Sequence, residues 1–157
     1  MSSMREKAVE GLKAGDSFEI TRTFGQAETE AFGHLTRDYN PVHYDQPFCR
    51  EKGLEGLICH GLLVASMICQ VGGQIAWLAS GMNFRFRRPV YFGDTITCRL
   101  VISEVDDNGR ALAQAVYRNQ HGQVVQEAQL RGYLPAARER ERLEAMTRAG
   151  DPTNPLV

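Results

Sequence analysis

The 157-residue sequence has almost no net charge: 18 Lys and Arg stand against 19 Asp and Glu, and the pI is near 6.4. A protein that holds nucleic acid or an anionic membrane through a broad basic face carries an excess of positive charge. We therefore expect neither of these among its partners. The first 14 residues mix charged and small side chains and contain no apolar stretch of the kind that marks a secretory signal peptide.

Cysteine is sparse too, and the four present (Cys49, Cys59, Cys69 and Cys98) form none of the C-x-x-C pairs that zinc sites and redox motifs use. Their mostly apolar neighbours predict free, buried thiols in a reducing compartment, so we expect a cytoplasmic protein without a metal site. The sequence also lacks a P-loop and the glycine fingerprint of dinucleotide-binding folds. No organic cofactor is therefore expected.

Charged side chains are missing from one long stretch, residues 56–84. Its length would suffice for a membrane-spanning helix, but His60, two glutamines and a pair of glycines interrupt it. A helix that is apolar all round is otherwise one buried inside a soluble protein. We predict such a helix over residues 61–79, ended by Ser80 and Gly81.

Strand-like alternation is found on both sides of this helix. A first strand and a short helix precede it, and four strands separated by turns follow it; the predicted ranges are strand 17–24, helix 28–35, and strands 82–91, 95–105, 110–119 and 123–134. Ala31, Phe32 and Leu35 are the predicted apolar stripe of the short helix. A further helical turn is expected over residues 46–52.

An antiparallel meander has one face to cover, and the helix at 61–79 is the element apolar enough to cover it. We therefore predict an α+β fold, a curved antiparallel sheet wrapped around a long central helix. The expected domain covers residues 15–135. An N-terminal extension (1–14) precedes it, and a charged tail (136–157), expected to form a loose helix with a disordered end, follows it.

The loop between the two helices contains Asp38, Asn40, Pro41 and His43. On an α-helix, residues five apart would lie roughly 140° apart around the axis, and proline disfavours a helix here. A loop can instead bring Asp38 and His43 to one point, where an acid and a base can share one water. The alternative is an ordinary turn with His43 on the surface, since Asp, Asn and Pro are common turn residues.

Three blocks of sequence carry a family resemblance: D-x-N-P-V-H-x-D at 38–45, I-x-H-G-x-L at 58–63 and F-x-R-P-V-x-x-G-D at 86–94. In this order and spacing they resemble the MaoC-like family, the (R)-specific enoyl-CoA hydratases, over residues 15–134. The resemblance implies a hotdog fold, usually dimeric, that acts on acyl thioesters. We accordingly expect a homodimer.

The resemblance also implies roles for individual residues. Asp38 and His43 are the catalytic pair, and the backbone amide of Gly61 faces the thioester carbonyl. Asn40 belongs to the same motif and fixes the loop. His60 either contacts the substrate or holds the loop from behind, and we favour the second interpretation. Asp45 is expected to be a hydrogen-bonding partner within the loop.

The implied activity is reversible hydration of trans-2-enoyl-CoA to (R)-3-hydroxyacyl-CoA, without metal or cofactor. One alternative is a 3-hydroxyacyl-acyl-carrier-protein dehydratase of fatty acid synthesis, and another is a non-catalytic protein that binds acyl thioesters. A hotdog thioesterase is disfavoured, because such enzymes often use a carboxylate on the central helix and residues 61–79 contain none. Arg85, Arg87 and Arg88 are candidate contacts to carrier phosphates.

Overall fold

The computed structural model describes residues 4–151 and 153–156. The strands are β1 (Ser17–Thr23), β2 (Leu78–Phe86), β3 (Thr95–Val105), β4 (Arg110–Arg118) and β5 (Val124–Tyr133). The helices are α1 (Met4–Glu10), α2 (Gln26–Thr36), α3 (Gln46–Glu51), α4 (Gly61–Ala65), α5 (Met67–Gln74) and α6 (Ala137–Arg148), with a short 3₁₀ turn η1 (Pro41–His43).

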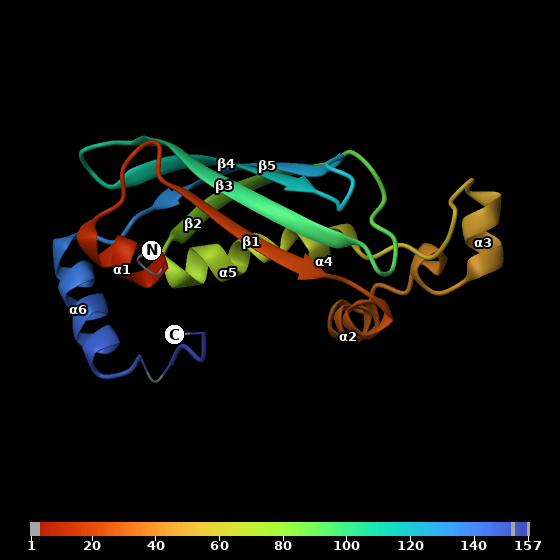
Figure 1. Cartoon of the computed structure of the whole chain (residues 1–157), viewed down its shortest axis with the longest axis horizontal. Coiled ribbons are helices and arrows are strands. Elements are labelled where there is room, and N and C mark those ends of the chain that lie inside the picture. Colours follow the sequence, from red (N-terminus) through yellow and green to blue (C-terminus); the bar gives the residue numbers. More distant parts are fainter. Residues whose placement is uncertain (1–3, 152, 157) are drawn as a thin grey trace.

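The five strands form one antiparallel sheet in the order β1-β3-β4-β5-β2. Helices α4 and α5 run along one face of it (Figure 1). Helices α2 and α3 lie beyond one end of this layer, and α1 and α6 lie at the opposite end, where both chain termini are found (Figure 1). The predicted α+β fold, with a sheet covered by a central helical element, is confirmed.

The core lies between the sheet and the α4–α5 pair. The middle strands bury their inward side chains, which are Ile96, Cys98, Leu100 and Ile102 from β3 and Ala111, Ala113, Ala115 and Tyr117 from β4. The three alanines of β4 follow one another on its inward face, and their small side chains leave space for the helices to approach the sheet closely. Larger buried side chains of the two helices pack into that space, namely Val64, Met67, Ile68, Val71 and Ile75.

The central helix is shorter than the predicted 61–79 and is divided in two at Ser66. It ends at Gln74 because Ala76 adopts a left-handed conformation (φ 53°) and the amide of Trp77 donates to the carbonyl of Gly72 (2.9 Å). This six-residue closure is the Schellman end of a helix, with alanine in the position that glycine usually takes. The chain therefore enters β2 at Leu78, and Ser80 and Gly81 belong to that strand rather than ending the helix.

Helix α2 has the predicted position but turns a different side to the protein. Its buried residues are Thr29 and Gly33, while Leu35 is 82 % exposed. Gly33 lies against the Tyr44 ring, where a Cβ would collide with the phenol oxygen. The predicted stripe is thus wrong for Ala31 and Leu35, because Gly33, and not the leucine, packs against Tyr44 of the following loop.

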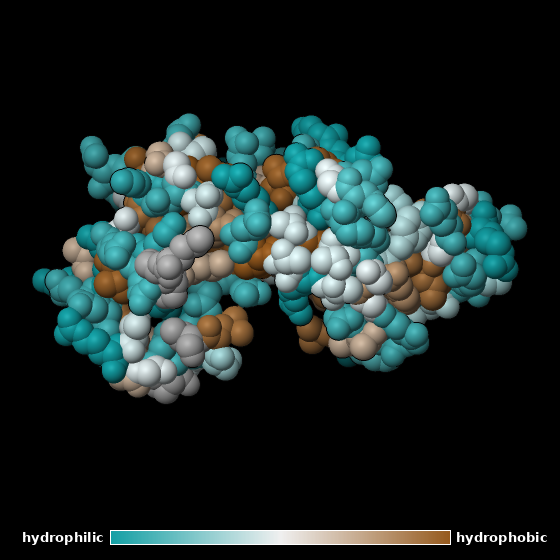
Figure 2. Space-filling model, viewed as in Figure 1, coloured by the Kyte–Doolittle hydropathy of each residue, from teal (hydrophilic) through white to brown (hydrophobic). Residues whose placement is uncertain are grey.

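The charged C-terminal segment forms helix α6 and continues as turns through the described residues 151 and 153–156. Leu143 of α6 is buried, and α6 packs against α1. Arg5 Nε and Asp151 Oδ2, both buried, form an ion pair of 3.2 Å between the two ends of the chain, by distance rather than by a well-aligned hydrogen bond among the described residues. The side-chain amides of Gln74 and Asn154 exchange two hydrogen bonds of 2.9 Å, which tie the C-terminal end to α5. The outer surface of α6 is hydrophilic (Figure 2). Residues 1–3, 152 and 157, which fall in the predicted extension and tail, lie outside the described residues.

Two smaller predictions concern cysteines and membranes. Cys49, Cys59 and Cys98 are buried free thiols, whereas Cys69 is exposed on α5, contrary to the prediction that all four are buried. Among the described helices, none combines the length and the apolar composition that crossing a membrane would need.

Candidate active site

The loop after α2 is built by its own polar side chains. Arg37 ends the helix in a left-handed conformation (φ 60°), which turns the chain at Asp38. Asp38 Oδ1 accepts a hydrogen bond from the amide of Asn40 (3.2 Å), and Asn40 Oδ1 accepts one from the amide of Val42 (3.3 Å). Asn40 thus caps the turn η1, whose first residue is Pro41. The D-x-N-P motif therefore folds the loop back on itself.

The loop places His43 inside the protein. Its Nδ1 lies 2.7 Å from the carbonyl oxygen of Ile58, which is reached only if this nitrogen carries the proton. Nε2 is then left with a free lone pair. Burial lowers the pKa of His43 below its usual value, and the charge of His60 acts in the same direction, while the Ile58 hydrogen bond and Asp38 oppose it. His43 is therefore a neutral proton acceptor at neutral pH.

His60 lies behind the loop and is only 1 % exposed. Its Nε2 lies 3.0 Å from the backbone oxygen of Asp38 and 3.8 Å from the carboxylate Oδ2 of the same residue. Its ring stacks on that of His43, with centroids 3.8 Å apart and planes inclined by 31°. This geometry supports the favoured interpretation of His60, a residue that holds the loop.

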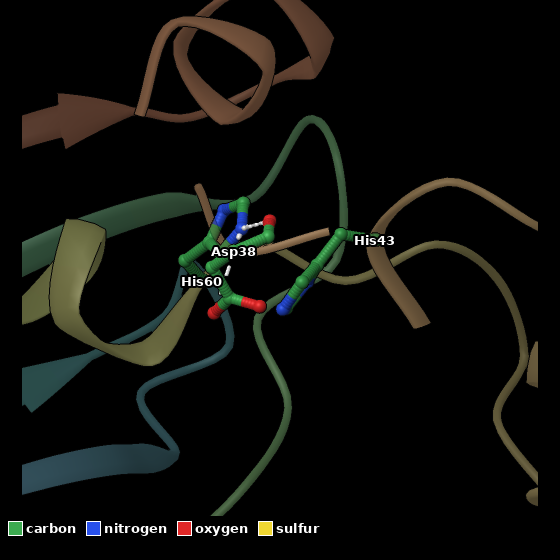
Figure 3. A group of neighbouring side chains, drawn as sticks. All are labelled: Asp38, His43 and His60. Carbon is green, nitrogen blue, oxygen red and sulfur yellow. Dashed lines mark hydrogen bonds and ion pairs between the residues drawn. The ribbon is translucent and has the colours of Figure 1, made fainter. Parts of the chain in front are cut away.

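The three side chains converge although they come from two separate motifs. One nitrogen or oxygen of each of Asp38, His43 and His60 lies within 4.8 Å of the others (Figure 3). Such a set can in principle hold a divalent cation. His60 Nε2, however, is used as a donor to the Asp38 carbonyl, so a metal would have to break the bond that fixes the loop. The arrangement suits proton transfer between Asp38 and His43 better.

A cavity of about 700 Å³ opens beside these groups. Most of its lining is apolar, including Phe32, Leu54, Ile58, Leu62, Val64, Phe86 and Val90. Asp38, whose side chain is 49 % exposed, and His43 line it together with His60 and Gly61. The cavity therefore offers an apolar chain a place to lie with one end against the acid–base pair.

Gly61 is the first residue of α4 and lines the cavity. A Cβ at this position would come within 2.8 Å of the Phe86 ring. Glycine is thus suited to this point because the aromatic ring and the helix backbone approach each other closely. Gln126 on β5 also reaches Gly61, and its Nε2 donates to the Gly61 carbonyl (2.8 Å).

Gln126 is a residue that the sequence analysis missed. It shares the inward face of β5 with Ala128 and Leu130 and is 2 % exposed. A glutamine in register with buried apolar residues was the available signal. Asp45, by contrast, has the predicted local role, because its Oδ1 accepts from the amide of Phe48 (2.7 Å) and so caps α3.

Of the three candidate arginines Arg85, Arg87 and Arg88, the structure places only two at the cavity. Arg85 is exposed on β2 and lies outside the cavity lining. Arg87 and Arg88 line the cavity. Arg87 is paired with Glu127, and Arg88 donates to the carbonyl of Val124 (2.8 Å).

Comparison with known proteins gives one matching family, described as MaoC like domain, over residues 9–125. The chain is 30 % identical to the (R)-specific enoyl-CoA hydratase of Aeromonas caviae over 105 residues, 64 % of this chain and 78 % of that protein. It is 34 % identical to a mitochondrial 3-hydroxyacyl-[acyl-carrier-protein] dehydratase of Arabidopsis thaliana over 97 residues, 60 % of this chain and 57 % of that protein. The solved (R)-hydratase of A. caviae, described as involved in PHA biosynthesis, superposes with a TM-score of 0.75 at 28 % identity, covering 80 % of this chain and 99 % of that one.

Proposed function

The chain belongs to the MaoC like domain family, and on that premise we propose that it is a hydro-lyase acting on acyl thioesters. It adds water to a trans-2-enoyl thioester to give the (R)-3-hydroxyacyl thioester, and it catalyses the reverse dehydration. The names of its relatives support both the coenzyme A and the acyl-carrier-protein form of this reaction. The observation that carries the proposal is the meeting of Asp38 and His43 at an apolar cavity.

The pair handles the two protons of the reaction. The neutral Nε2 of His43 and the Asp38 carboxylate both accept hydrogen bonds from one water, whose oxygen attacks C3 of the substrate. One proton of the water passes to the pair as the C3–O bond forms and the C2–C3 π bond breaks. The pair then returns a proton to C2 of the enolate, so the water has been added and the residues are regenerated.

Negative charge develops on the thioester oxygen during this addition. Fixed hydrogen-bond donors at that point are usually one of the largest contributions to catalysis. The Gly61 amide, in the lining of the cavity beside the acid–base pair, is the donor that we assign. Asn40 and His60 keep the loop in place rather than touching the substrate, since their hydrogen bonds are made to the loop itself.

The carrier is held, in this proposal, at the side of the cavity where Arg87 and Arg88 lie. Arg88 is the stronger candidate for a phosphate contact, because Arg87 already pairs with Glu127 (2.6 Å). Arg85 lies outside the lining and has no part in the proposal. A coenzyme A thioester is therefore the expected substrate, with an acyl-carrier-protein thioester as the alternative.

The assembly is proposed to be a homodimer formed through β2. This strand is an edge of the sheet, so one row of its backbone groups lacks a strand partner among the described residues. It also exposes Leu78, Met82 and Phe86. An exposed, apolar edge strand tends to be paired or covered, and a second copy of β2 can do both.

Two further proposals concern the domain and the compartment. Residues 15–135 form the catalytic domain, with α1 and α6 as an added layer. The free thiols support a reducing compartment such as the cytoplasm.

The test of the proposed function is a panel of enoyl and 3-hydroxyacyl thioesters, each as the coenzyme A and the acyl-carrier-protein form, followed at the absorbance of the conjugated enone. Turnover of (R)- but not (S)-3-hydroxyacyl substrates is expected. Thioester binding without turnover would support the non-catalytic alternative, and release of free thiol would support a thioesterase.

A further inference from the structure

Gln126 is a buried polar side chain that the acid–base chemistry does not explain. It lies on the inward face of β5, and its register partners are Phe86 on β2 and Tyr117 on β4. Along this face the strand continues with the buried residues Ala128 and Leu130. An amide therefore stands where the strand pattern calls for an apolar side chain.

Only half of this amide is satisfied. Nε2 donates to the Gly61 carbonyl (2.8 Å), whereas Oε1 is buried and has no hydrogen-bond partner within the described part of the chain. A buried acceptor without a partner costs free energy that an apolar side chain of similar shape would avoid. Stability therefore gives little reason for a glutamine here, and the bond to Gly61 must be explained in another way.

Gly61 is held from two sides by the same pair of strands. The Phe86 ring packs against its Cα, so closely that a Cβ would lie 2.8 Å from the ring, and Gln126 holds its carbonyl. Phe86 and Gln126 are directly opposite each other in the β2–β5 ladder. Glycine has the widest backbone freedom of any residue. Holding its carbonyl and packing a ring against its Cα restricts rotation of the glycine backbone, and so limits the directions in which its amide can point.

We propose that Gln126 is a positioning residue: it holds Gly61 so that the Gly61 amide meets the thioester oxygen as negative charge develops there. The inference rests on the proposed function, which gives the Gly61 amide that task. Donors act on an oxyanion only within a narrow range of positions, about 2.7–3.1 Å from the oxygen. A misplacement of about 1 Å can cost about 10²-fold in rate.

The test is Gln126→Met, which keeps the length of the side chain and removes the donor. Its matched control is Gln129→Met, on the outward, exposed face of the same strand. We expect Gln126→Met to lower kcat by about tenfold to 10²-fold, with KM within about twofold and an unchanged or raised Tm. The control should keep the parent's kcat.

A spectroscopic measurement separates positioning from a merely structural role. Butyryl-CoA labelled with ¹³C at the carbonyl cannot be hydrated, and its carbonyl stretch reports the hydrogen bond that the oxygen receives. Binding to the parent and to Gln129→Met should lower this frequency. Binding to Gln126→Met should lower it less.

A second variant, Gln126→Glu, tests the donor itself, because a carboxyl group can donate to the Gly61 carbonyl only when it is protonated. The ratio of its kcat to the parent's should therefore rise as the pH is lowered, and a ratio that does not change with pH would contradict the inference. A Gln126→Met variant with the parent's kcat and carbonyl shift would overturn it as well. A parent enzyme without turnover would instead overturn the proposed function.

Discussion

At the scale of single residues, His43 is the group whose surroundings say most about the chemistry. Burial lowers its pKa, and its Nδ1 is occupied by the Ile58 carbonyl. A histidine whose pKa is lowered stays neutral down to a pH below the ordinary value of about 6.5. The acid limb of kcat/KM, which reports the free enzyme, should therefore lie below that value.

His60 provides a test of this account through His60→Gln, since glutamine can still donate to the Asp38 carbonyl. His60 is one of the causes that lower the pKa of His43. Removing it should move the acid limb of kcat/KM to higher pH, while the loop keeps its hydrogen bond. The measurement is the pH dependence of kcat/KM for both proteins. A limb that stays in place or moves to lower pH would show that His60 does not influence His43 in this way.

Residue types in a motif could be predicted from the sequence, but their neighbours could not. Asp38 and His43 stand out because Pro41 between them excludes a helix, and Gly61 stands out because it is a glycine at the start of an apolar helix. That His43 stacks on His60, and that His60 is bonded to the carbonyl of Asp38, depends on how two segments meet in space. Gln126 was missed because the irregular alternation of β5 hides which face it lies on, so the signal it offers, a polar residue in register with apolar ones, is weak.

At the scale of elements, the break between α4 and α5 is held by the sheet. The hydroxyl of Tyr117, buried on β4, donates to the carbonyl of Ala65 (2.9 Å), the last residue of α4. Ser66 Oγ donates to the carbonyl of Leu63 (2.6 Å). The end of a helical segment leaves carbonyls without intrahelical partners, so these two hydroxyls satisfy oxygens at the break.

Tyr117→Phe should therefore destabilise the fold. The variant leaves the Ala65 carbonyl buried without its donor, which costs about 1–3 kcal/mol. Urea unfolding measures this change in the free energy of unfolding. Tyr133→Phe is the control, because Tyr133 is an exposed residue whose hydroxyl accepts a hydrogen bond from the exposed Arg110. It should cost well under 1 kcal/mol, as a surface substitution does. Equal losses in the two variants would contradict a special role for Tyr117.

The positions of the elements were predictable because alternation and turn residues mark them, as at the inward-facing Ile96, Cys98, Leu100 and Ile102. The end of α5 could not be predicted, because it depends on Ala76 in a left-handed conformation, and alanine gives no sequence signal for that conformation. The orientation of α2 was missed for a related reason. Gly33 faces inward because the Tyr44 ring fills the space beside it, a contact between segments eleven residues apart.

At the scale of the whole molecule, the two ends of the chain are joined by the Arg5–Asp151 ion pair. Asp151→Asn keeps the shape of the side chain and tolerates the positive φ of 41° at this position. It leaves the charge of Arg5 buried without a partner, so a loss of about 3–5 kcal/mol is expected in urea unfolding. Glu144→Gln breaks an exposed pair with Arg148 and should cost less than about 1 kcal/mol. A loss as small for Asp151→Asn would show that the ends are not held by this pair.

The proposed dimer is tested at the edge of the sheet. Met82→Lys places a charge at a half-exposed position of the edge strand β2, where a second copy would pair, whereas Leu112→Lys places one on the central strand β4. Light scattering at micromolar concentration should give a dimeric mass for the parent and for Leu112→Lys, and a monomeric mass for Met82→Lys. A parent that is monomeric and fully active would contradict the proposal.

The central claim is that Asp38 and His43 act as one acid–base unit on a water at the mouth of the cavity. The most direct test compares kcat for the parent, Asp38→Asn, His43→Gln and the double variant on one enoyl thioester, with folding checked by circular dichroism. Each single variant should lose about 10²–10⁴-fold, the contribution of a positioned acid or base. The double variant should lose little more than either single one, because residues that act as a unit are not additive. Losses that multiply in the double variant, or a parent without turnover, would contradict the account.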